Sequence, residues 1–237
     1  MINIPKITFV YDIEKDIDNI IIGIETVRNG RNPDRIIKEI INKYGESPSR
    51  DNIKSFLENI WKDKSYIREM SIKQLQEYWD KINDIYFERL ADFMEIKEYE
   101  KESLKIPGYF SSRHGSGYNV PNLWFAVSLY SGTMQNVITA MHEIMHLFFH
   151  KYWWNECKKY GLDNKNIWDV KEAVTVLLNI WYKDIITELD WGYMEHTDLR
   201  RLIIKKWWPG KNNFSEIVKL SCEYMKENKE KSPTWIK

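Results

Sequence analysis

The sequence has no excess of charge of either sign. Its 237 residues include 35 basic and 35 acidic side chains, so the formal net charge at pH 7 is zero. Proteins that bind nucleic acid or anionic membranes usually present a basic surface to the phosphates. The balance argues against a nucleic-acid or membrane partner, although the basic segment RRLIIKK at 200–206 leaves local nucleic-acid binding open.

Cysteine is scarce. The two cysteines, Cys157 and Cys222, are far apart in the sequence and stand in none of the paired spacings of cysteine metal sites. Two cysteines cannot form the disulfide framework of a small secreted protein. We predict that both are free thiols, because a chain of this length can bury a sufficient core without a covalent staple.

A targeting segment and a membrane span are also missing. The N-terminus MINIPKITFVYDIEKD reaches acidic residues before any signal-like apolar segment is complete, which predicts a cytoplasmic location. Residues 114–142 contain no Lys, Arg, Asp or Glu, but polar residues interrupt them well short of the roughly 20 apolar residues that a membrane helix needs. We interpret this stretch as buried.

Hydrophobic periodicity predicts a mostly helical first half. A short β-prone run at 7–11 comes first. Apolar residues then recur at helical spacing in three segments, 17–27, 53–60 and 75–90. The composition changes near residue 105, so we divide the chain into a mostly helical N-terminal region at 1–100, which can be integral to the catalytic domain, and a catalytic domain at 101–237.

The second half is expected to contain a strand followed by two helices. Residues 122–130 alternate with a period of two, which predicts a strand. A polar turn at 131–133 leads into a helix at 135–154, and a further helix is expected at 167–186. The first of these helices is apolar nearly all round, which predicts a buried central helix.

That central helix contains the motif His-Glu-x-x-His at 142–146. Residues four apart on a helix share a face, so His142 and His146 can bind one metal ion, and zinc is the ion that this motif favours. Glu143 lies about 100° further round, where it can act as general base on a water without ligating the metal. The helix is apolar nearly all round, so the alternative is that both histidines are ordinary core residues bonded to backbone carbonyls.

The third ligand is less directly encoded. His150 lies about 12 Å along the helix axis from His142, too far for both to bind one ion, so we exclude it and expect a hydrogen bond near the helix end instead. Glu172 lies in an apolar helical segment, where an unpaired carboxylate is costly, and is the preferred ligand. Its alternatives are a surface carboxylate at this position, or a ligand role for another acidic residue, namely Asp163, Asp169 or Glu188.

Four further residues have candidate supporting roles beside the metal. Asp169 or Asn179 can accept a hydrogen bond from the outer nitrogen of a ligating histidine. In the segment after the Glu172 helix, Tyr193 and His196 can each donate a hydrogen bond to a developing oxyanion, although such residues are as often structural.

The run HEIMH, followed by Glu172 in KEAVTVLLN, resembles the gluzincin clan of zinc peptidases over residues 105–190. This resemblance implies an α+β, predominantly helical, zincin-like fold with a small mixed sheet and an active-site helix. It also implies that the strand LWFAVSLY at 123–130 is an edge strand above the cleft that pairs with extended substrate. A plain sheet strand without a ligand is the alternative.

These observations predict a zinc metallopeptidase, a hydrolase of peptide bonds in peptide or protein substrates. His142, His146 and Glu172 would bind Zn²⁺, and Glu143 would take a proton from the metal-activated water and deliver it to the leaving amine. The alternatives are a non-catalytic zincin-fold protein that binds a peptide or protein partner, and a hydrolase of non-peptide amides. The sequence predicts neither the oligomeric state nor the cleavage specificity.

Overall fold

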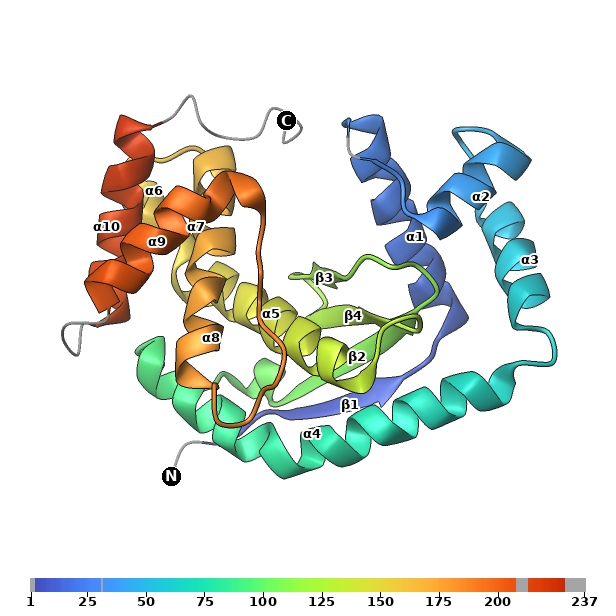
Figure 1. Cartoon of the computed structure of the whole chain (residues 1–237), viewed down its shortest axis with the longest axis horizontal. Coiled ribbons are helices and arrows are strands. Elements are labelled where there is room, and N and C mark those ends of the chain that lie inside the picture. Colours follow the sequence, from blue (N-terminus) through green and yellow to red (C-terminus); the bar gives the residue numbers. More distant parts are fainter. Residues whose placement is uncertain (1–2, 31, 208–212, 229–237) are drawn as a thin grey trace.

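The computed structural model describes residues 3–30, 32–207 and 213–228, and within them the chain is mostly helical with one small mixed sheet, as expected for an α+β protein (Figure 1). The strands are β1 (Lys6–Val10), β2 (Lys105–Ser111), β3 (Gly117–Asn119) and β4 (Trp124–Ser128). The α-helices are α1 (Ile13–Arg28), α2 (Arg35–Tyr44), α3 (Arg50–Trp61), α4 (Ser65–Phe93), α5 (Thr133–Tyr152), α6 (Trp154–Lys159), α7 (Asn164–Val174), α8 (Leu178–Trp181), α9 (Thr197–Trp207) and α10 (Phe214–Glu227). Short 3₁₀ helices are η1 (Lys101–Leu104), η2 (Thr175–Leu177) and η3 (Met194–His196).

The sheet has the strand order β1-β2-β4-β3. β1, β2 and β4 are parallel, and β3 runs antiparallel to β4. Parallel neighbours cannot be joined by a tight hairpin and need a crossover connection, which α1 to α4 provide between β1 and β2. The β-prone run at 7–11 is therefore confirmed as β1, and it pairs with a strand about one hundred residues later, with Ile7 opposite Ile106.

The prediction that 123–130 is an edge strand is wrong. β4 lies between β2 and β3, and all five of its residues are buried. The edge beyond β4 is β3, which is only three residues long. A strand this short shows no recognisable alternation in the sequence, so the pattern at 122–130 identified a strand correctly but could not reveal its neighbour.

Aromatic side chains join the sheet to α4. The ring of Phe9 on β1 makes edge contacts with Trp79 of α4 at 5.8 Å between centroids and with Phe125 of β4 at 5.9 Å. Gly108 of β2 lies beneath these rings, where a Cβ atom would approach the Phe9 ring to 2.7 Å. The helical segments expected in the first half are confirmed as α1, α3 and α4, and α1 to α3 share a second, smaller apolar cluster.

The helices of the second half differ from expectation mainly at their ends. The helix expected at 135–154 is α5, and the one expected at 167–186 is α7, which continues through η2 into α8 and ends at Trp181. It ends early because Tyr182 leaves the helical region, with φ −120°, and its buried hydroxyl donates to the carbonyl of Tyr86.

Both cysteines are buried free thiols, as predicted. Within the described ranges, none of the helices combines the length and the apolar character required to cross a membrane.

A buried carboxylate connects α1 to the end of β2. Asp16 accepts hydrogen bonds from the Ser111 hydroxyl at 2.8 Å and from the Ser112 backbone N–H at 2.8 Å and hydroxyl at 2.5 Å. Burial raises the pKa of Asp16, and the hydrogen bonds from Ser112 and Ser111 oppose that shift. The three donors therefore fix the start of the segment that leads from β2 to β3.

We predict that Asp16→Ala lowers the free energy of unfolding by about 3 kcal/mol, because it leaves buried hydroxyl and amide donors without an acceptor. Asp18→Ala is the matched control on the same helix. The Asp18 side chain is 33% exposed and pairs with Arg50 on the surface, so its loss is expected to cost at most about 1 kcal/mol. Urea unfolding of both variants measures the difference, and equal losses would contradict the structural role of Asp16.

Candidate metal centre

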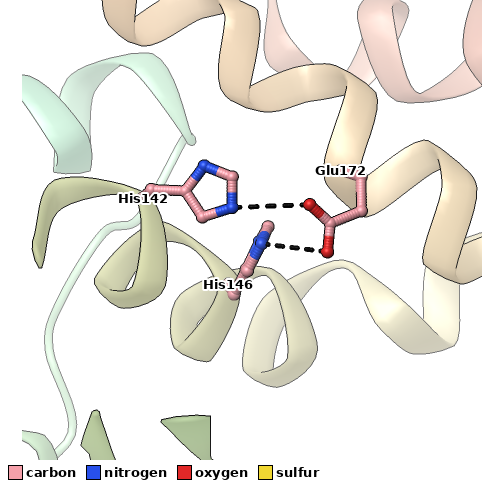
Figure 2. Close-up of side chains that lie close together, drawn as sticks. All are labelled: His142, His146 and Glu172. Atoms are coloured by element: carbon pink, nitrogen blue, oxygen red, sulfur yellow. Dashed lines mark ion pairs between the residues drawn. The ribbon is translucent and has the colours of Figure 1, made fainter. Parts of the chain in front are cut away.

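Three side chains predicted as metal ligands lie together between α5 and α7 (Figure 2). His142 and His146 project from one face of α5, and Glu172 reaches them from α7. Nε2 of His142 is 3.4 Å from Oε2 of Glu172, and Nε2 of His146 is 3.3 Å from Oε1. One ligand atom from each residue lies within 4.8 Å of the others, so a single ion can contact all three.

The separations have the spacing of ligands around a metal ion. A charge-assisted N–H···O bond is about 2.7–2.9 Å long. Ligand atoms about 2.0–2.1 Å from a tetrahedral zinc ion are about 3.4 Å apart, and each histidine Nε2 lies at about this distance from one of the two Glu172 oxygens. Among the described residues, Nε2 of His146 and Oε2 of Glu172 are buried and have no hydrogen-bond partner. Such atoms are costly to bury, and a bound metal ion satisfies them.

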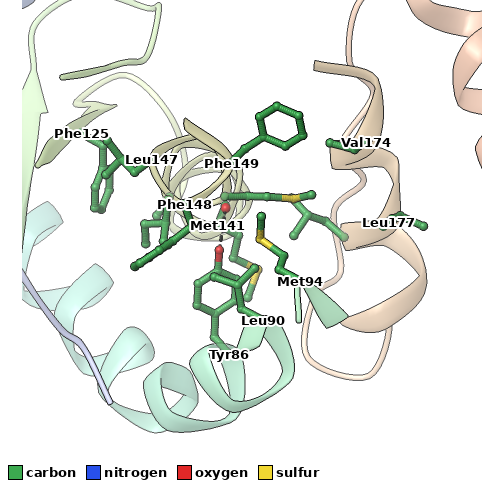
Figure 3. Close-up of a cluster of buried hydrophobic side chains, with 14 of the residues drawn as sticks. Tyr86, Leu90, Met94, Phe125, Met141, Leu147, Phe148, Phe149, Val174 and Leu177 are labelled. Carbon is green, nitrogen blue, oxygen red and sulfur yellow. Dashed lines mark hydrogen bonds between the residues drawn. The ribbon is translucent and has the colours of Figure 1, made fainter. Parts of the chain in front are cut away.

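Packing around α5 fixes which face carries the histidines (Figure 3). The buried hydroxyl of Tyr86 on α4 donates to the carbonyl of Met141 at 2.8 Å, one residue before His142. Leu90 and Met94 from the α4 side, and Val174 from α7, surround the helix with apolar contacts. Because these neighbours enclose α5, the helix cannot rotate its metal-binding face away from Glu172 without opening the core.

Lys171 supplies a buried positive charge beside the site, and sequence reasoning missed it. Its Nζ lies 2.7 Å from Oε1 of Glu172, and the side chain is fully buried. Burial alone would raise the pKa of Glu172, but the charge of Lys171 holds it well below its usual range. Burial and then the Lys171 charge lower the pKa of His146. Glu172 is therefore ionised and His146 neutral, which are the forms that coordinate metals.

The outer nitrogen of His142 faces Asp190. Nδ1 of His142 is 2.8 Å from Oδ1 of Asp190, whose other oxygen accepts from Thr175 at 2.7 Å and from Arg200 at 3.0 Å. Although burial works to lower the pKa of His142, the carboxylates of Asp190 and Glu172 raise it to about 10. A carboxylate in this position orients a ligating imidazole and increases its basicity.

The sequence prediction that Asp169 or Asn179 plays this part is wrong. Asp169 instead lies 2.9 Å from Nε2 of His196, and Asn179 holds the backbone of Asp190 through its side-chain amide at 2.8 and 2.9 Å. Asp190 belongs to the connection between α8 and η3, which passes over α5 in Figure 1. It is 48 residues from His142, so no local pattern indicates the contact.

Glu143 is buried next to the three candidate ligands, with 5% of its surface exposed. Burial raises its pKa, while the charge of His142 and a hydrogen bond with the Ser116 side chain partly oppose the shift. A carboxyl group with a raised pKa can take up and release a proton closer to neutral pH than an exposed glutamate can.

A cavity of about 240 Å³ opens beside His142 and is lined in part by Ser116, Thr139, Asp190 and Tyr193. Tyr193, one of the two predicted oxyanion donors, therefore reaches the space where a substrate can lie. His196, the other predicted donor, is buried against Asp169 and is not part of this lining. Tyr193 therefore lies at the candidate site, whereas His196 is buried away from the cavity lining.

The remaining candidates lie outside the metal-binding group. Glu188 and Asp163 are exposed, and Asp163 caps α7 by accepting from the backbone of Asn166. His150 meets the Tyr118 hydroxyl at 3.0 Å, consistent with the hydrogen-bonding role expected for it near the end of α5. Tyr118 belongs to β3, and its ring also lies 5.3 Å from that of His146, so β3 is the strand that borders the site.

The chain matches no protein-family model, no curated protein and no solved structure. The functional assignment therefore depends on the residues and geometry of this site.

We predict that zinc binding at pH 7.5 releases about one proton. The pKa of His142, about 10 in the metal-free protein, keeps its ring protonated at this pH, whereas a ligating imidazole must be neutral. Proton release should consequently fall as the pH rises through 10. Titration calorimetry with zinc chloride in buffers of different ionisation enthalpy measures the number of protons.

Asp190→Asn tests the cause of this proton release. Removing the Asp190 charge lowers the pKa of His142, although Glu172 still raises it, so proton release at pH 7.5 should be smaller than in the wild type. Asp198→Asn is the control, because its side chain is 64% exposed and lies on the surface beside Arg201. Equal proton release from the wild type and Asp190→Asn would show that Asp190 does not control the charge of His142.

Proposed function

We propose that this chain is a zinc-dependent metallopeptidase of the gluzincin type, with a zincin-like catalytic fold. The observation that supports it most directly is the buried group of His142, His146 and Glu172, at the mutual spacing of metal ligands and beside a cavity. Catalytic zinc sites use three protein ligands, and the described residues offer three. A cytoplasmic location stays a prediction of the sequence.

His142, His146 and Glu172 would hold a zinc ion, which would supply a Lewis acid to polarise a peptide carbonyl and to lower the pKa of a bound water. Glu143 is the base that takes the proton, because it adjoins His142 in sequence and its raised pKa allows it to hold that proton. Glu143 then returns the proton to the nitrogen of the leaving amine. Tyr193, at the cavity wall, is placed to donate a hydrogen bond to the developing oxyanion.

β3 is the strand that we propose for pairing with an extended substrate, in place of β4. Its partner on one side is β4, and its Tyr118 side chain packs against His146 and His150. The sheet order places its other side at the edge, where backbone groups can bind a peptide by adding a strand. This arrangement brings the substrate backbone alongside α5.

Three glutamate-to-glutamine variants test the proposed roles. Glu143→Gln should keep about one equivalent of zinc and lose hydrolysis by at least about 100-fold, because a proton acceptor is removed while the ligands remain. Glu172→Gln should lose both zinc and hydrolysis, because it removes a charged ligand. Glu188→Gln, at an exposed position, should keep both. Zinc is measured by elemental analysis, and hydrolysis with an unfolded protein substrate, with and without a chelator.

Each result separates the proposed roles from their alternatives. Full hydrolysis by Glu143→Gln would refute its role as general base. A wild-type protein that binds zinc and cleaves neither unfolded protein nor peptides would support the non-catalytic alternative, in which the site binds a peptide or protein partner. A wild-type protein that does not bind zinc would support the alternative in which His142 and His146 are ordinary core residues.

A further inference from the structure

The segment that orients His142 also exposes large apolar side chains. Leu189 is 46% exposed and Trp191 is 78% exposed, on either side of Asp190. Both line the cavity beside His142, together with Ile138 of α5. Exposed tryptophan is uncommon on a protein surface without a binding role, and here it lies at the mouth of the candidate active site.

This segment is held in place at Asp190, directly before Trp191. The N–H of Asp190 donates to Asn179 at 2.8 Å, and its carbonyl accepts from Asn179 at 2.9 Å and from Arg200 at 2.5 Å. Gly192 follows with φ +62°, where a Cβ atom would meet the Arg200 guanidinium. The backbone directly before Trp191 is therefore anchored by Asn179 and Arg200, which reduces the entropy that a ligand must remove on binding.

The cavity lining has little to offer a charged ligand. Ser116, Gln135, Thr139 and Tyr193 are uncharged. Asp190 and His142 are the charged side chains in the lining, and they contact each other at 2.8 Å, while the second oxygen of Asp190 accepts from Thr175 and Arg200. A charged side chain entering this space would lose water beside charges that are already paired, whereas an apolar side chain would gain contacts with Leu189, Trp191 and Ile138.

We propose that Leu189, Trp191 and Ile138 form an apolar wall that binds a large aliphatic or aromatic side chain of the peptide substrate next to the bond that is cleaved. The proposal rests on the proposed peptidase function and names its substrate class. The wall adjoins the metal site because Asp190, between Leu189 and Trp191, contacts a candidate zinc ligand. Trp191 is thus the residue that determines specificity.

Cleavage sites mapped by mass spectrometry in an unfolded protein provide the first test, and should have Leu, Met, Phe or Tyr on one side of the broken bond. Two fluorogenic peptides are then compared. They differ only in the residue at that position next to the cleaved bond, which is Leu in one peptide and Ser in the other. Trp191→Ala should lower kcat/KM for the Leu peptide about 10-fold and change that for the Ser peptide less than about twofold.

Met194→Ala is the matched control. Met194 is 90% exposed in the same segment but does not line the cavity, so both peptides should be cleaved as by the wild type. Zinc content and the unfolding midpoint should be unchanged in Trp191→Ala, because its exposed side chain contributes little to the core. An equal loss on both peptides, or no preference for Leu in the wild type, would overturn the wall as a specificity site while leaving the peptidase assignment intact.

Binding measured without turnover separates this proposal from the proposed function. Zinc-loaded Glu143→Gln should bind the Leu peptide about 10-fold more tightly than the Ser peptide, and adding Trp191→Ala should remove the difference. If this discrimination is observed and the wild type cleaves no peptide, the peptidase assignment is wrong, but the binding of an apolar peptide side chain by the wall is supported. A concentration-dependent dimer abolished by Trp191→Ala, with no discrimination between the peptides, would instead assign the wall to self-association and overturn the proposal.

Discussion

The negative charge of Glu172 inside the core is the constraint on which the second half of the molecule depends. An ionised carboxylate in an apolar interior costs several kcal/mol unless opposite charges or hydrogen-bond donors surround it. Lys171 provides such a charge from the same helix, and the two histidines of α5 face the carboxylate from the other side. α5 and α7 must therefore pack in one register, because sliding either helix would leave a buried charge uncompensated.

The parts of this site that the sequence predicts are those encoded by local periodicity. His142 and His146 share a face because four residues make about one helical turn, and Glu143 is placed by the same geometry. The distance along the helix axis also excludes His150 as a ligand of the same ion, and that residue contacts Tyr118 instead. Glu172 was identified by a different signal, a carboxylate within an apolar helical segment, and it lies opposite the histidines.

The features that the sequence does not predict arise from contacts between distant segments. Asp190 reaches His142 across 48 residues, and an aspartate beside a tryptophan in a loop carries no helical or strand pattern. The sheet order is similarly hidden, because β3 is too short to show a period of two. Lys171 lies in the same apolar segment as Glu172, and a lysine next to a glutamate in such a segment indicates a buried ion pair.

Two buried aspartates, from opposite halves of the chain, fix segments that line two neighbouring cavities. Asp16 of α1 fixes the end of β2, from which the chain continues to Ser116, and Asp190 fixes the segment that carries Trp191. Cavities of about 330 and 240 Å³ meet at Ser116 and Tyr193, the larger one lined by α1 and α2 and the smaller one by α5. The N-terminal helices are consequently part of the surface that a long substrate would contact.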